Sequence, residues 1–381
     1  MPYDDPNLKE FDNYYQARSA SKRERAENWA VAIGLQKVDG LTPSRYLIDV
    51  AKRHIEGDIS GAAATRMIDK YYETKAGHDM PEDVKEADRV SARINEVIEE
   101  EGFNLSPTCL IGLHGLIFEG VFPHAGSIRE VNLRKREWVL RGDSVTYGHA
   151  PMIEKTLEYD FDREREFSYA NKGKKEIVSH FARFISGIWQ IHPFREGNTR
   201  TTAVFAIKYL KSMRIEVSND IFAEHSWFFR NALVRANYEN PLKGYHRDLE
   251  PLERFFRNLI MGERNELKNR YLLVGISDDE RAALGKGLEG SAKKRSEKSG
   301  QKKAVRKSGQ KTVDRLLALI ASHPHITQAG MVAALGITRS TIQKHLSNLK
   351  STGKLRRVGP DKGGHWEVIG LAQAWVPPRR C

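Results

Sequence analysis

A short segment near the middle of the chain combines residue types that could bind a phosphate and move a proton. It reads Ile191-His192-Pro193-Phe194-Arg195-Glu196-Gly197-Asn198-Thr199-Arg200. Helical spacing of apolar residues on both sides predicts a loop that leads into the N-terminus of a helix. Such a terminus presents free backbone N–H groups and the positive end of the helix dipole, and both favour an anion. The segment therefore predicts a phosphate site.

The side chains of this segment fit that chemistry. His192 can accept a proton near neutral pH, and Glu196 offers Mg²⁺ a carboxylate beside the phosphate. Gly197 lets the backbone approach a ligand closely, while Arg200 supplies a cationic fork one turn into the helix. Phe194 is expected to point into the core and to fix the loop. One histidine or one Gly-Asn pair would be weak evidence, but six compatible residues within nine positions favour a functional site.

The segment resembles the signature of the Fic family, HxFx[DE]GNGRxxR. The matching positions are His192, Phe194, Glu196, Gly197, Asn198 and Arg200. Residues 123–129 resemble the Pro/Ala-Gly-x-x-Arg segment that the family carries upstream, and residues 138–147 lie where its target-docking flap would be. The resemblance covers residues 100–265 approximately, and its central motif is highly specific.

The resemblance implies a protein adenylyltransferase. His192 would be the catalytic base that deprotonates a Ser, Thr or Tyr hydroxyl, on another protein or on the chain itself. That hydroxyl would attack the α-phosphate of ATP, and pyrophosphate would leave. Glu196 would bind the Mg²⁺ that bridges the phosphates. Asn198 and the loop amides would hold the α-phosphate, and Arg200 the β-phosphate. The complete set of ATP-binding residues would be Arg195, Glu196, Gly197, Asn198, Thr199 and Arg200.

Two positions depart from the family signature. Thr199 replaces its second glycine, and because a β-branched residue is strained at positive φ, Thr199 must adopt a helical or extended conformation. Ala203 stands where the family has a second arginine that contacts the γ-phosphate, and a methyl group cannot make that contact. Two alternatives to adenylyl transfer therefore stay open. One is a DNA-binding regulator whose Fic core only senses nucleotide, and the other is a Fic transferase of another phosphate-containing group.

Residues 1–80 are predicted to form a helical region that resembles the antitoxin modules of many Fic enzymes. In those modules a helix with [ST]xxxE[GN] uses its Glu to pair with the second arginine of the signature. One alignment places this helix at Leu35–Gly40 with Asp39 in place of the Glu, and a rival places it at Lys52–Gly57 with Glu56. We favour the first. Because Ala203 offers no charge, we expect no strong inhibition by these helices, and a simple packing role is the alternative.

The predicted fold is mainly α. A Fic-type helical core with a small β-hairpin flap at residues 137–147 is expected over residues 100–275, followed by an α+β winged helix-turn-helix domain at residues 312–372. Around and within the core, apolar spacing predicts helices over 81–101, 108–122, 174–191, 201–213, 221–237 and 251–273.

Residues 285–311 lack apolar periodicity and are predicted to be a basic flexible linker. From Lys286 to Lys311, ten Lys/Arg stand against Glu289 and Glu297, a net charge of +8 out of +12 for the chain. The linker is either merely solvated or an arm that faces a polyanion.

The last domain resembles the winged helix-turn-helix of bacterial regulators, which also occurs as a protein-interaction module. The basic linker before it favours DNA. Side chains expected to face a DNA groove are Arg339, Ser340, Gln343 and Lys344, and those expected to face the phosphate backbone are Arg356, Arg357 and Lys362.

Composition sets the remaining expectations. The 381 residues are 40% hydrophobic and 29% charged, without a run of 18 apolar residues, so we expect two or three soluble domains and no membrane partner. Cys109 and Cys381 cannot build a disulfide framework, which favours the cytoplasm. The expected partners are ATP, Mg²⁺, a protein hydroxyl and duplex DNA, and a homodimer is one assembly that the sequence allows.

Overall fold

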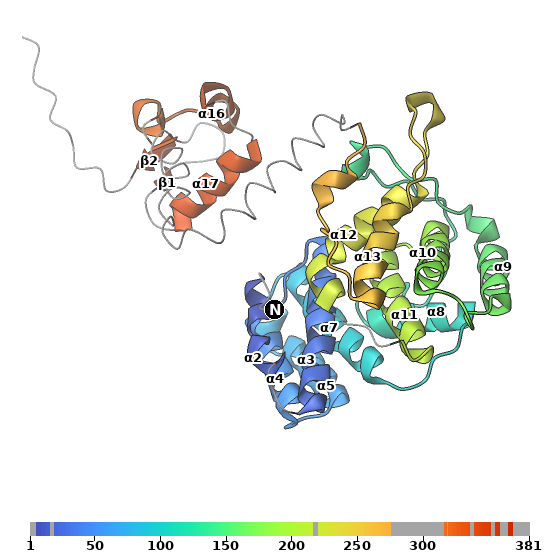
Figure 1. The fold of residues 1–381 in the computed structure, drawn as a ribbon. Coiled ribbons are helices and arrows are strands. Elements are labelled where there is room, and N and C mark those ends of the chain that lie inside the picture. The colour runs from blue at the N-terminus through green and yellow to red at the C-terminus, as the bar shows by residue number, and fades with distance from the viewer. Residues whose placement is uncertain are drawn as a thin grey trace, which may run out of the picture. The chain divides into compact units, whose positions relative to one another are not determined.

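The structure is a computed structural model that describes residues 5–15, 19–215, 220–275, 316–317, 319–335, 339–351, 355–358 and 365–368. It divides into two compact units, residues 1–281 and 282–381. The described residues are mainly helical (Figure 1), which confirms the predicted fold class. The predicted linker at 285–311 lies outside them. None of the helices in the described ranges combines the length and the apolar character that a membrane crossing requires.

The first unit is built from helices joined by short turns and loops. In chain order its α-helices are α1 (Pro6–Lys9), α2 (Asp12–Tyr15), α3 (Ala20–Gly34), α4 (Arg45–Glu56), α5 (Gly61–Glu73), α6 (Lys75–His78), α7 (Glu82–Glu99), α8 (Pro107–Phe118), α9 (Ile153–Glu166), α10 (Lys174–Ile191), α11 (Asn198–Ser212), α12 (Asp220–Asn237) and α13 (Glu250–Met261). Its 3₁₀ helices are η1 (Leu35–Asp39), η2 (Trp138–Leu140), η3 (Ala150–Met152), η4 (Pro241–Lys243) and η5 (Asn269–Leu272).

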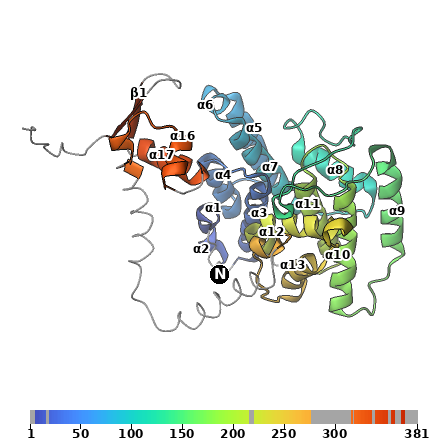
Figure 2. The same ribbon diagram turned by 90° about the horizontal axis from the view of Figure 1, so that it is seen from above.

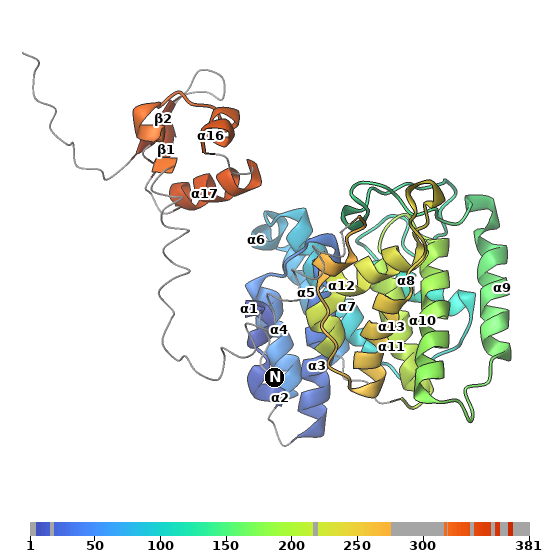
Figure 3. The same ribbon diagram turned by 45° about the horizontal axis from the view of Figure 1, so that its top comes forward.

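Helix α7 joins the N-terminal helices to the rest of the first unit. It contacts α3 and α5 on the one hand and α8 and α11 on the other, and Figures 2 and 3 place it between these groups. Its buried Asp88 accepts hydrogen bonds from the N–H and Oγ of Ser44, at 2.8 and 2.5 Å, and from the hydroxyl of Tyr72 at 2.6 Å. Ser44 caps α4 and Tyr72 lies in α5, so this carboxylate fixes both helices against α7.

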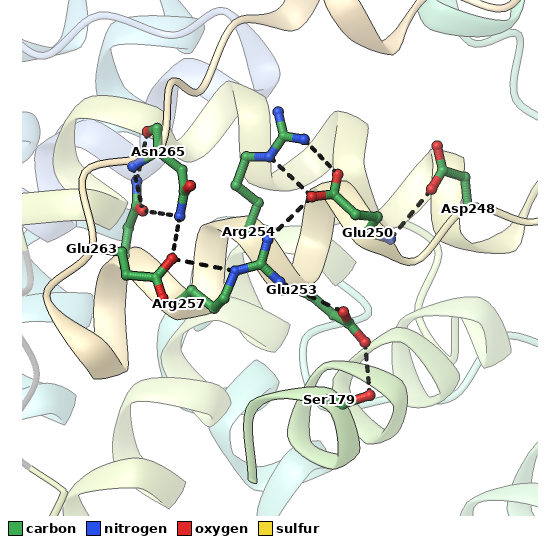
Figure 4. Close-up of polar contacts among 9 residues, drawn as sticks. Ser179, Asp248, Glu250, Glu253, Arg254, Arg257, Glu263 and Asn265 are labelled. Atoms are coloured by element: carbon green, nitrogen blue, oxygen red, sulfur yellow. Dashed lines mark hydrogen bonds and ion pairs between the residues drawn. The ribbon is translucent and has the colours of Figure 1, made fainter. Parts of the chain in front are cut away.

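Helices α10 and α11 flank the loop at His192–Gly197. Phe181, Ile185 and Trp189 of α10 are buried in the same core as Phe205 of α11, and burial of such side chains is the main stabilising contribution to the fold. The outer face of the neighbouring α13 carries a polar network (Figure 4), in which Ser179 of α10 donates to Glu253 of α13 at 2.7 Å. Packing and this hydrogen bond together hold α10 against α13.

Two local predictions need correction, and one helix had no prediction of its own. Residues 137–147 were expected to form a β-hairpin, but they contain η2 and no strand. The chain does reverse there, because Arg141 and Gly142 have positive φ and the N–H of Glu137 donates to Asp143 O at 2.8 Å. The helix predicted over 251–273 ends at Met261, where Gly262 adopts φ 69° as a left-handed cap. Helix α9 was not predicted individually.

The second unit contains helices followed by a two-stranded sheet. Residues 316–322 are helical apart from residue 318, which is not described. Helices α16 (Gln328–Leu335) and α17 (Arg339–Ser351) precede strands β1 (Leu355–Val358) and β2 (His365–Val368), which pair antiparallel. Side chains from all these elements share one small core: Leu316, Ile320, Met331, Ile342, Leu346, Leu349, Leu355 and Trp366.

Candidate active site

The turn at His192 is held by a buried arginine. Helix α10 ends at Ile191, and His192 follows with φ 52° and ψ 59°, a left-handed conformation that strains a residue with a side chain. Arg129, 1% exposed, donates from Nε to His192 O at 2.7 Å and from Nη2 to Gly148 O at 2.5 Å and Ile191 O at 3.2 Å. These hydrogen bonds stabilise the strained turn, so Arg129 positions His192.

The imidazole of His192 has one nitrogen available for chemistry. Nδ1 lies 3.4 Å from Trp189 O, and because a carbonyl can only accept, Nδ1 carries the hydrogen of the neutral ring. Nε2 is buried and has no hydrogen-bond partner among the described residues. Burial first, and then the positive charges of Lys135, Arg129 and Arg230, hold the pKa of His192 well below its usual range. The ring is therefore neutral at physiological pH, with a free lone pair on Nε2.

The loop after His192 is closed by the side chain of Asn198. Its Nδ2 donates to Phe194 O at 2.7 Å, and its Oδ1 accepts from Phe194 N at 3.0 Å. Gly197 adopts φ 73°, and a Cβ there would lie 2.4 Å from the ring of Phe118, so the position requires glycine. The N–H of Thr201 bonds to Gly197 O, which leaves the preceding N–H groups of α11 without intrahelical acceptors. An anion could bind these donors.

A histidine that the sequence analysis did not single out supports this loop. His114 in α8 accepts at Nδ1 from the N–H of Gly126 at 2.9 Å, so its Nε2 donates to Glu196 O at 3.2 Å. Its ring stacks on Phe194 with centroids 3.8 Å apart, and burial lowers its pKa to about 4. A histidine between apolar residues of a predicted helix was the only available signal, and it is a weak one.

The two departures from the signature have distinct structural settings. Thr199 lies in the first turn of α11, which confirms the helical alternative predicted for it, and its Oγ1 accepts from Trp189 Nε1 at 3.0 Å. Ala203 is fully buried in the core of the first unit. An arginine at this position would have to fit among packed apolar side chains.

Arg200 is held by the N-terminal half of the first unit. Its guanidinium donates to Gln36 Oε1 at 3.1 Å and to Glu86 Oε1 at 2.7 Å, and its Nε lies 2.9 Å from Asp39 Oδ2. The same group lies over the ring of Phe118, 4.8 Å from the centroid. Arg200 is 2% exposed, so its charge is fully engaged by protein groups in this structure.

A small polar pocket contains the free face of His192. It is lined by Asp39, Lys135, Glu137, Trp189, His192, Gly197, Asn198, Thr199 and Arg230, and its volume is about 30 Å³. That volume suits about one water molecule, whereas ligand pockets are roughly ten times larger or more. Arg230 donates two hydrogen bonds to Glu137, at 2.7 and 3.1 Å. The pocket is charged, closely filled and closed to a nucleotide in this arrangement.

Arg195 and Glu196 are the exposed residues of the loop. The described residues contain no group of three or more His, Cys, Asp or Glu side chains that could hold a metal ion by themselves. A single exposed carboxylate beside an anion site nevertheless suits Mg²⁺, which keeps several waters and takes its other ligands from phosphates. The donor chemistry of Glu196 fits that ion.

Six of the seven predicted DNA-facing residues belong to α17 and β1 of the second unit. Gln343 of α17 is exposed and donates to Gln328 Oε1 at 3.4 Å. On β1, Arg356 pairs with Glu367 at 2.6 Å, and Arg357 lies over the ring of Trp366, 4.8 Å from its centroid. Three residues of α17, namely Arg339, Ser340 and Lys344, have side chains outside the described part, and Lys362 lies outside it entirely.

Comparison with known proteins identifies the middle of the chain. No curated protein matches the chain. Among solved structures, a Fic family protein from Desulfovibrio desulfuricans is 16% identical with a TM-score of 0.40, over 96% of this chain and 95% of that one. The N-terminal Fic domain of an effector protein from a Bartonella species is 17% identical with a TM-score of 0.37, over 46% of this chain and 81% of that one. A family match covers the loop, His192 and most of α11, and residues 104–210 are a domain of the Fic/DOC family.

Proposed function

We propose that this chain is a Fic-type protein adenylyltransferase, which transfers AMP from Mg-ATP to a Ser, Thr or Tyr hydroxyl of a protein. The Fic/DOC domain suggests transferase activity, and one observation carries the more specific proposal. His192 Nε2 is a buried, unpartnered nitrogen with a lone pair, and it shares a pocket with the start of α11. A base and an anion site are the two parts that hydroxyl attack on a phosphate requires.

In the proposed reaction the hydroxyl proton passes to His192 Nε2. The hydroxyl oxygen forms a bond with the α-phosphorus of ATP, and the bond between that phosphorus and the bridging oxygen to the β-phosphate breaks, so pyrophosphate leaves. The N–H groups at the start of α11 stabilise the charge on the transferred phosphoryl group. Arg129 and Asn198 keep the base and the loop in place, while Glu196 is the proposed Mg²⁺ ligand. Bound Mg²⁺ supplies charge neutralisation of the phosphates.

Labelled ATP tests the type of transfer. Purified protein is incubated with Mg²⁺ and ATP labelled at either the α- or the γ-phosphorus, together with a protein extract as acceptor. Adenylyl transfer predicts that protein acquires the α label and not the γ label. Incorporation of the γ label alone would show that another phosphate group is transferred, as the alternative raised by Ala203 allows.

A second candidate is a DNA-binding regulator whose Fic domain senses nucleotide without transferring a group. Ala203 and the ion pairs of Arg200 with Asp39 and Glu86 favour it. The free lone pair of His192 favours transfer, because a sensor needs no base.

Under both candidates the second unit is proposed to bind duplex DNA as a winged helix-turn-helix, and the protein is proposed to act in the cytoplasm. A sensor predicts that ATP changes DNA affinity in protein that acquires no label.

A further inference from the structure

Lys135 is the lysine that lines the His192 pocket, and it comes from outside the signature segment. Its backbone N–H donates to Ser144 Oγ at 3.3 Å, which joins the two arms of the loop that reverses at Arg141-Gly142. The side chain is half-buried. Its place in the pocket therefore depends on this loop and not on α10 or α11.

The ammonium of Lys135 is unpaired, whereas the arginine that lines the same pocket is paired. Arg230 is bound by Glu137, but within the described ranges the Lys135 ammonium makes no hydrogen bond or ion pair. Burial lowers the pKa of Lys135, while the nearby carboxylates of Asp39, Glu137 and Glu196 favour its charged form. A partly desolvated ammonium without a partner is expected to bind an anion strongly.

Two further observations indicate which anion. His192 Nε2, also unpartnered and buried, belongs to the same pocket, and so do Asn198 and Thr199 at the start of α11. If His192 takes the proton of the attacking hydroxyl, the phosphoryl group that receives this oxygen must lie next to His192 Nε2, which requires the small pocket to open. Lys135 is then placed to meet an oxygen of that group.

We propose that Lys135 is a catalytic residue that binds a non-bridging oxygen of the transferred phosphoryl group. The inference rests on the proposed function and adds a cation that the Fic signature does not contain. Its charge stabilises the negative charge that develops as the hydroxyl oxygen bonds to phosphorus. It also adds positive charge to a phosphate site that lacks the signature arginine at position 203.

Binding of AMP and adenosine tests this contact without any reaction. AMP carries the phosphoryl group and adenosine lacks it, so the ratio of their affinities measures what the phosphate adds. In Lys135→Met, AMP is expected to bind roughly ten- to a hundredfold more weakly, as for the loss of a charged hydrogen bond, with adenosine affinity unchanged. Lys135→Arg should recover part of the loss. Arg136→Met is the matched control, because Arg136 is the exposed neighbour that does not line the pocket.

The outcomes separate this inference from the proposed function. Unchanged AMP affinity in a folded Lys135→Met protein overturns the contact, and so does the absence of AMP binding to the wild-type protein. If Lys135→Met labels protein from α-labelled ATP at the wild-type rate, the inference fails and adenylyl transfer stands. If neither the wild-type protein nor any variant labels protein, but AMP binding still depends on Lys135, adenylyl transfer fails and the phosphate contact stands. Thermal unfolding of each variant verifies its fold.

Discussion

The carboxylate of Asp39 lies 2.9 Å from Nε of Arg200, and this ion pair joins η1 of the N-terminal region to helix α11. From the sequence we expect no strong inhibition by the N-terminal helices, because Ala203 offers Asp39 no charge to pair with. In the structure Asp39 pairs with Arg200 instead. Glu56, the residue of the rival alignment, pairs with Lys22 at 2.5 Å. Since the pocket has a volume of only about 30 Å³, some of the residues that line it, Asp39 among them, have to move before a nucleotide can enter.

Asp39→Asn is expected to raise ATP affinity. The change removes the ion pair with Arg200 while keeping the size of the side chain. Because a partly exposed ion pair contributes little free energy, we expect ATP affinity to rise only about two- to fivefold. Titration of both proteins with ATP measures the effect. Glu56→Gln is the control for the rival alignment and is expected to leave affinity unchanged. A larger gain from Glu56→Gln than from Asp39→Asn would contradict the assignment of Asp39.

Gly197→Ala is expected to destabilise the first unit by about 1–3 kcal/mol. Gly197 has φ 73°, and the added Cβ would lie 2.4 Å from a ring carbon of Phe118. Gly112→Ala provides a matched control, because Gly112 lies within α8 and a Cβ there has nothing within 4 Å. That substitution should stabilise the protein by roughly 0.5–1 kcal/mol. Urea unfolding of the two variants compares them, and equal effects would refute the strain assigned to Gly197.

His114 is expected to make stability depend on pH. Its folded pKa is about 4 against an ordinary value of 6.5, so below pH 6.5 the unfolded chain takes up a proton that the folded protein does not. Its contribution therefore destabilises the protein progressively as pH falls from 6.5 to about 4, by about 2 kcal/mol between pH 7 and pH 5. Urea unfolding at both values should give a smaller loss for His114→Asn than for the wild type. Equal losses would show that His114 does not titrate in this way.

The sequence predicted well those features that arise within one short segment, and it predicted poorly those that depend on contacts between distant segments. Helices α7, α10 and α12 have long apolar stripes and were predicted closely. The loop at 137–147 alternates as a strand would, but the conformation of Arg141-Gly142 and contacts with distant elements set its structure. The contacts of Arg200 with Gln36 and Glu86, like the place of Lys135 beside His192, join residues far apart in the sequence. No spacing pattern within one segment could show them.

Removal of residues 282–381 is expected to abolish binding to duplex DNA and to leave labelling from ATP unchanged. The reason is that residues 1–281 form a compact unit that contains the whole candidate active site. Binding by the full chain should weaken steeply as salt rises, because Lys and Arg side chains displace counterions from phosphates. Fluorescence anisotropy with labelled duplex DNA at several salt concentrations measures both effects. Salt-independent binding, or binding retained by the shortened protein, would argue against DNA contact through the second unit.

The role of His192 is tested most directly by its replacement. Wild-type protein and His192→Ala are incubated with α-labelled ATP, and the initial rate of label transfer to protein is measured alongside ATP affinity and thermal unfolding. Loss of a general base predicts a rate lower by roughly 10²–10⁴-fold, with the fold intact and ATP still bound. Transfer at the wild-type rate by a folded His192→Ala protein would contradict the assignment of His192 as the base.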